Sequence, residues 1–191
     1  MSFLNLPSEL RYQIYAIIAL PDVTPFSKYR GLYLSCRQIK ADLDSEWPKA
    51  FDAHLASISK RTPCIHLSTP KSGPIAARQH VRLILDPDIQ LDASNLKTLF
   101  APSFHLYVPS LTLAFGRSTG PRDLSRDGWT IIDIFRHNAA VIKAPVVKLE
   151  FPRGYKEHHI GHVLPRVWTC EWVVGDDQTV CVWRRTARVK G

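Results

Sequence analysis

The first element of the fold is predicted by residues 6–20, which have the sequence LPSELRYQIYAIIAL. Pro7 stands where a first-turn proline is tolerated, because its missing N–H would have no partner inside a helix. Glu9 lies near the positive end of the helix dipole. Apolar residues recur on one face at helical spacing, with Arg11 outside that face. They are Leu6, Leu10, Ile14, Ile17 and Ile18. We therefore expect a helix over 6–20, ended by Pro21.

A second helix is predicted over residues 32–47, after a loop at 21–31 that is rich in turn-forming residues. Its apolar positions recur every three or four residues and so share one face. They are Leu32, Cys36, Ile39, Leu43 and Trp47. Pro48 is expected to end this helix, and residues 51–58 to form a short third one.

The pattern changes after residue 59. The segment 59–79 holds three prolines and several polar residues, and is predicted to be a linker with a brief strand at 64–67. Beyond it, predicted strands alternate with predicted helices. The strands are 81–85, 111–115 and 146–151, and the helices are 95–101 and 129–143. Such alternation favours right-handed β–α–β crossovers and a mainly parallel sheet.

Two arrangements of these strands remain open. The strands start at Val81, Leu111 and Val146, a spacing of about 30 to 35 residues that lies within the range of repeat architectures. Only the strand pattern recurs, because the helical parts differ from one another. An irregular leucine-rich-repeat-like stack and a small α/β sheet both fit this pattern.

The last predicted elements are two strands, 167–174 and 179–185, which flank turn residues at 175–178 and form a β-hairpin. With Val174 opposite Thr179, the facing pairs on one side are Trp172 with Cys181 and Cys170 with Trp183. We expect this side to be packed. The two cysteines become diagonal neighbours, with Cα atoms roughly 7–8 Å apart, which is too far for an unstrained disulfide.

The predicted fold is therefore α+β. A helical module occupies residues 1–58, the linker follows at 59–79, and a small α/β region over 80–191 ends in the hairpin. With 191 residues, 45% of them hydrophobic, and five tryptophans, the chain has enough apolar side chains to form a core.

Charge and cysteine content limit the surroundings of the protein. The net charge of +8 favours acidic partners, whether protein, nucleic acid or anionic membrane. The longest apolar stretch, Ile14 to Leu20, is shorter than the roughly 20 residues of a transmembrane helix. The N-terminus lacks the basic flank of a secretory signal. We therefore expect an intracellular protein, in the cytoplasm, the nucleus or both, whose four cysteines are thiols.

Several possible sites of chemistry lack the residues that would complete them. His158 and His162 would share a helix face and could bind zinc, but no Cys-x-x-Cys or His-Glu-x-x-His pattern supplies further ligands. Residues 116–120 have the sequence GRSTG, but Pro121 follows and no Lys-Ser/Thr pair opens a helix there. Asp86 and Asp88 flank a proline and fit a turn. We expect no catalytic residue, no metal and no cofactor, and therefore no enzyme.

Two motifs occur together and in order within the first 50 residues. Residues 6–10, LPSEL, are followed by Ile14, and residues 35–39, SCRQI, are followed by Leu43 and Trp47. This pattern resembles the F-box, which opens with Leu-Pro-x-Glu-hydrophobic and closes with a Cys-Arg pair, an apolar residue and a later Trp. The resemblance extends from Phe3 to about Pro48, and the residues at its motif positions are similar to those of F-box-like proteins of filamentous fungi. The middle segment, 20–23, half fits the family pattern.

The resemblance implies docking on the Skp adaptor of a cullin ubiquitin ligase, with an unknown protein substrate held by the C-terminal region. The residues it assigns to the adaptor-facing surface are Leu6, Pro7, Leu10, Ile14, Cys36, Arg37 and Ile39.

Two alternatives follow from the residues themselves. The helices can simply pack on the rest of the protein, as in any helical core. Nucleic acid is the other possible partner, with Trp168 and Trp183 stacking on bases while Arg184 and Arg185 contact phosphates.

Overall fold

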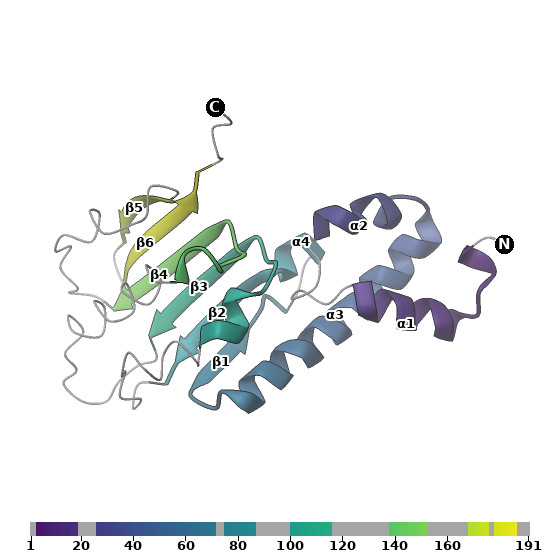
Figure 1. The fold of residues 1–191 in the computed structure, drawn as a ribbon, viewed down its shortest axis with the longest axis horizontal. Coiled ribbons are helices and arrows are strands. Elements are labelled where there is room, and N and C mark those ends of the chain that lie inside the picture. Colours follow the sequence, from purple (N-terminus) through teal and green to yellow (C-terminus); the bar gives the residue numbers. More distant parts are fainter. Residues whose placement is uncertain are drawn as a thin grey trace.

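The computed structural model describes residues 3–18, 26–71, 75–86, 100–115, 138–152, 168–175 and 178–186. N-terminal helices are followed by a mixed six-stranded sheet, so the predicted α+β class is confirmed (Figure 1). The helical elements are η1 (Phe3–Asn5), α1 (Ser8–Ile18), α2 (Phe26–Tyr33), α3 (Arg37–Arg61) and α4 (Ile75–Arg78). The strands are β1 (Ile65–Ser68), β2 (His80–Leu85), β3 (Ser110–Phe115), β4 (Val146–Pro152), β5 (Trp168–Val174) and β6 (Gln178–Arg185).

The sheet has the strand order β1-β2-β3-β4-β6-β5. Its centre is parallel, because β2 pairs in parallel with β3 and β3 with β4. The sheet as a whole is not mainly parallel as expected, since the other three of its five pairings are antiparallel. Antiparallel strands complete both sides, β1 next to β2 and β6 next to β4. β5 and β6 form the predicted hairpin in the predicted register, with Val174 opposite Thr179.

Helix α3 differs from the prediction at Pro48. We expected a helix end there and a separate short helix afterwards, but one 25-residue helix passes through the proline. Its buried stripe continues on both sides of Pro48, through Leu43, Trp47, Phe51, Leu55 and Ile58. Trp47 stacks on Phe51 with ring centroids 4.5 Å apart. Burial of this stripe outweighs the cost of an interior proline, about 3 kcal/mol.

The start of α3 also differs from the prediction. Residues 26–33 form α2 where the loop and the beginning of the second helix were expected, and α3 begins only at Arg37. Cys36 is its N-cap, with an extended backbone (φ −160°, ψ 162°), and its Sγ accepts a hydrogen bond of 3.4 Å from the Ile39 N–H. The extended conformation of the cap separates the two helices, because an N-cap residue is not itself helical.

The segment predicted as a linker, 59–79, carries regular structure in its described part. α3 runs on to Arg61, and the expected brief strand is present as β1, an edge strand of the sheet. The Leu67 N–H donates to the Ser59 Oγ at 3.3 Å, which ties β1 to the end of α3. Ile65 is buried. In the described residues 59–71 and 75–79, the prolines and polar residues therefore lie within or between short regular elements.

Of the two crossover helices that the sequence predicts, the structure describes only residues near the C-terminal ends. Residues 100–104 are helical, which continues the helix expected at 95–101. Residues 129–137 of the helix expected at 129–143 lie outside the described residues; residue 138 is helical and residues 139–141 form a turn, so no helix extends to 143. The Arg185 guanidinium donates to the carbonyl oxygens of Ala139 (3.1 Å) and Ile142, and so satisfies carbonyls at this helix end. The GRSTG segment and the three histidines at 158–162 lie outside the described residues.

A continuous cluster of buried side chains joins the helices to the sheet. It extends from Tyr15 of α1 through Trp47 and Ile58 of α3 to Leu83 and Trp183 of the sheet. In Figure 1, α1 and α2 lie beside the N-terminal part of α3, away from the sheet, and the C-terminal part of α3 lies along β1. α3 is therefore the element that connects the N-terminal helices to the sheet.

Candidate functional site

Helix α1 contacts α3 through a partly polar face. Its buried residue is Tyr15, and Arg11, one turn earlier, lies on the same side. Leu10, Ile14 and Ile17, at positions i, i+4 and i+7, form an apolar row on a neighbouring side; we call these three residues the α1 stripe. Leu10 is 45% exposed and Ile17 is 65% exposed, and Ile14 is half-buried. The apolar row is thus turned toward solvent and the polar residue toward α3.

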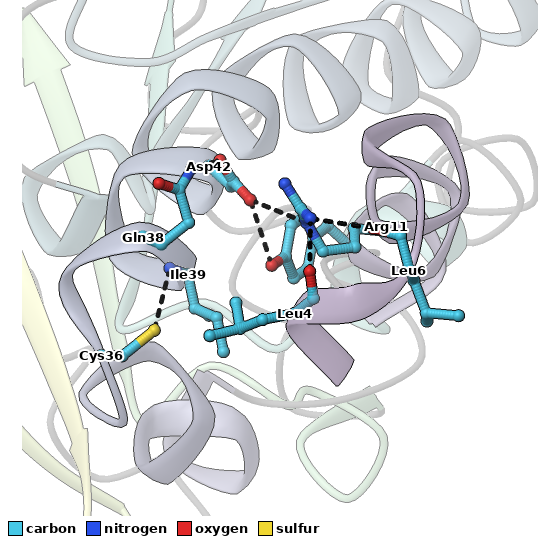
Figure 2. Close-up of polar contacts among 8 residues, drawn as sticks. Leu4, Leu6, Arg11, Cys36, Gln38, Ile39 and Asp42 are labelled. Carbon is cyan, nitrogen blue, oxygen red and sulfur yellow. Dashed lines mark hydrogen bonds and ion pairs between the residues drawn. The ribbon is translucent and has the colours of Figure 1, made fainter. Parts of the chain in front are cut away.

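A buried carboxylate holds α1 on α3. Asp42 Oδ2 lies 3.2 Å from Arg11 Nε and accepts a 3.5 Å bond from the Tyr15 hydroxyl, while Oδ1 accepts a 2.7 Å bond from Gln38 Nε2 (Figure 2). The Asp42 side chain is only 5% exposed. Burial and the neighbouring Asp42 charge raise the pKa of Tyr15. A buried ion pair is tolerated when further hydrogen bonds satisfy its remaining polar atoms, as they do here.

The same arginine fixes the segment before α1. Arg11 Nη1 donates to the Leu4 carbonyl oxygen at 3.1 Å and to the Leu6 carbonyl oxygen at 2.9 Å, so one guanidinium joins η1, α1 and α3 (Figure 2). This contact sets the direction in which the chain enters α1. Pro7, between these carbonyls and the helix, is exposed. Hydrogen bonds to Arg11 therefore fix the backbone that carries Leu6 and Pro7.

The residues assigned to the adaptor-facing surface separate into three groups by exposure. Pro7, Leu10 and Arg37 are exposed, and Leu6, Ile14 and Cys36 are half-buried. Ile39 is 5% exposed and belongs to the core, so its side chain does not face a partner as expected. Cys36 acts as a helix cap. The surface that remains consists of Leu6 and Pro7 just before α1, the assigned residues of the α1 stripe, and Arg37 at the start of α3.

Besides Leu10, four exposed apolar side chains that were not assigned to the site lie at the same end of the molecule. The described residues contain seven large hydrophobic side chains that are exposed, and five of them lie between positions 4 and 34. They are Leu4 (40%), Leu10 (45%), Tyr12 (37%), Ile17 (65%) and Leu34 (61%). The helical period placed Ile17 beside Leu10, but nothing in the sequence marked Leu34, which follows α2 in the turn before α3.

The hairpin residues considered for nucleic-acid stacking lie inside the fold. Trp168 is 6% exposed and Trp183 is 2% exposed. The Arg185 guanidinium lies 5.0 Å from the Trp168 ring centroid and also binds the helix-end carbonyls described above. Arg184 lies 3.9 Å from Glu171, with both side chains exposed. Of the four residues expected to bind nucleic acid, both tryptophans are therefore buried, and only the two arginines are exposed.

Two further groups of polar residues are candidates for ligand binding or catalysis. An open pocket of 480 Å³ between α3 and residues 101–105 is lined by His54, Ile58, Arg61, Ala101, Pro102 and His105, a set that suits an anion. His80 Nδ1 lies 2.6 Å from the Ser110 hydroxyl at the first paired position of β2 and β3. A serine nucleophile needs a base that a third group orients, and the described contacts of His80 include no such group.

Comparison with known proteins adds no relative, since the chain matches no family model, no curated protein and no solved structure. Among the described residues, no helix has the length and apolar character needed to cross a bilayer. The same residues contain no group of three or more potential metal ligands.

Proposed function

We propose that the N-terminal helices dock on a Skp-type adaptor and that the protein acts as a substrate-recognition subunit of a Skp–cullin–F-box ubiquitin ligase. The observation that carries this proposal is the orientation of α1, whose apolar stripe faces solvent while Arg11 and Tyr15 face α3. Surface helices normally turn their apolar side to the core. Exposed apolar side chains gathered at one end of a protein are typical of a binding surface. The Leu-Pro-x-Glu and Cys-Arg motifs supply the identity of the partner.

The mechanism follows from the way α3 connects the two ends. Its N-terminal part holds α1 through Asp42, and its C-terminal part packs on the sheet. A helix of 25 residues is about 37 Å long and transmits orientation without a flexible joint. A substrate bound by the sheet region would therefore be held at a fixed distance from the ligase. The contribution to ubiquitin transfer is proximity, and the chain itself supplies no reacting group.

A titration of full-length protein with a purified Skp-type adaptor tests the proposal. Changing both Leu10→Ala and Ile17→Ala should weaken binding roughly thirtyfold or more, because an anchor at an interface centre contributes about 2 kcal/mol or more. The melting temperature should stay close to that of the wild type, since both side chains are largely exposed. Val173→Ala is the matched control, because Val173 is 49% exposed on β5, at the other end of the molecule.

Two results would count against adaptor docking. One is wild-type binding that the double substitution leaves unchanged. The other is an absence of wild-type binding together with nucleic-acid binding that weakens steeply as salt is raised, which would favour the alternative function through phosphate contacts.

A further inference from the structure

The β5–β6 hairpin brings two thiols into contact. Cys170 Sγ and Cys181 Sγ are 3.2 Å apart, although Cys170 is paired with Trp183 and Cys181 with Trp172. The two side chains point toward each other across the diagonal of the hairpin, so their sulfur atoms are close although the two residues are not directly paired. A disulfide needs sulfur atoms about 2.0 Å apart, so the sulfur atoms must approach further, and a bond across this diagonal pair would be strained. β5 is the edge strand of the sheet, where such a movement disturbs one neighbour only.

The two thiols differ in access. Cys181 is fully buried at 0% exposure, whereas Cys170 is half-buried. The hydrogen bond with Cys181 lowers the pKa of the Cys170 thiol, against the effect of its own burial. The thiolate is the nucleophile in exchange with a disulfide, so an accessible thiol of lowered pKa reacts first. Cys36 and Cys64 are also half-buried, but among the described contacts neither has a thiol partner.

We propose that Cys170 and Cys181 form a redox-active modification site, oxidised by a low-molecular-weight disulfide of the glutathione type. The Cys170 thiolate attacks one sulfur of that disulfide, which forms a mixed disulfide and releases one thiolate. Cys181 then loses its proton and attacks the Cys170 sulfur, which forms the intrachain bond and releases the second small thiol. The protein loses two electrons and two protons, and the small disulfide gains them.

The experiment uses the full-length protein treated with glutathione disulfide and analysed by mass spectrometry of non-reduced peptides. Wild type should yield a Cys170–Cys181 bridge with no glutathione retained at either position. Cys181→Ser should stop at the first step and carry one glutathione on Cys170. Cys170→Ser should leave Cys181 unmodified, because that thiol is buried. Cys36→Ser is the matched control and should bridge as the wild type does.

Wild-type protein alone decides the outcome if a variant fails to fold. Protection of both Cys170 and Cys181 from alkylation after treatment, reversed by dithiothreitol, supports the site. Stable glutathione on wild-type Cys170 without a bridge overturns the proposal, as does full alkylation of both thiols after treatment. Adaptor binding does not enter this measurement, so its result is independent of the proposed docking function.

Discussion

Asp42 accepts hydrogen bonds from Arg11, Tyr15 and Gln38 and forms an ion pair with Arg11. Its side chain is only 5% exposed. Asp42→Ala should lower the free energy of unfolding by about 3 kcal/mol, because the part-buried Arg11 side chain (13% exposed) loses its only carboxylate partner among the described contacts and keeps two carbonyl acceptors. The measurement is urea unfolding. Asp44→Ala is the control, since its ion pair with Lys40 is largely exposed (37% and 51%) and should contribute at most about 1 kcal/mol. Equal losses in both variants would contradict the role given to Asp42. Helical periodicity placed Arg11 outside the apolar face and could not reveal this contact, because the partner lies 31 residues away.

The buried residue Tyr29 makes the free energy of unfolding depend on pH in the alkaline range. Burial raises its pKa from 10.0 to about 12, although a hydrogen bond with Trp47 acts in the opposite direction. The neutral phenol is favoured in the folded state, so its contribution to stability is complete below pH 10 and is lost as the pH rises toward 12. The free energy of unfolding of Tyr29→Phe, measured with urea from pH 8 upward, should fall less steeply with pH than that of the wild type. Tyr12→Phe, at a 37% exposed position, should follow the wild type, and a shallower loss in that variant instead would contradict the account.

Helix α3 shows that its buried apolar positions, and not Pro48, determine how far the helix extends. Pro48 predicted a break, but the buried stripe before and after it keeps one helix. Pro48→Ala should raise the free energy of unfolding by about 1 kcal/mol or more, since it restores a backbone donor and removes a ring that clashes with the preceding turn. Some of the gain is offset because proline also restricts the unfolded chain. Pro63→Ala, beyond the end of α3 and exposed, should change stability by less than about 0.5 kcal/mol. A loss of stability in Pro48→Ala would mean that the proline shapes the packing of α3.

The strands were more predictable than the helices. The predicted strands at 81–85, 111–115 and 146–151 each match the observed bounds to within one residue. Alternation of buried and exposed side chains is a local property, and the hairpin register follows from a short turn. Helix continuity at Pro48 and the outward direction of the α1 stripe depend on contacts made later in the chain. For this reason the sequence assigned Ile39 to the adaptor-facing surface although its side chain is buried, while the assignment of the Leu-Pro segment stays a prediction.

At the scale of the whole molecule, the shared core determines how the protein unfolds. Trp47 in α3 and Trp183 in β6 belong to one buried cluster. Urea unfolding followed by tryptophan fluorescence and by helical circular dichroism should therefore give the same midpoint. A helical signal that is lost first would mean that residues 1–58 form a separable module, as the sequence pattern indicated. The sequence could not reveal the shared core, because the prolines and polar residues at 59–79 are typical of linkers as well as of short edge strands.

The central claim is that the α1 stripe and its surroundings contact a Skp-type adaptor. Hydroxyl-radical footprinting measures it directly, because aliphatic side chains are oxidised in proportion to their exposure. Adding the adaptor should reduce oxidation of Leu10, Ile17 and Leu34, which are 45%, 65% and 61% exposed in the protein alone. Val173, at 49% exposure on the far strand β5, should be oxidised to the same extent with and without the adaptor. Oxidation of Leu10 and Ile17 that the adaptor leaves unchanged, or protection confined to Val173, would contradict the account.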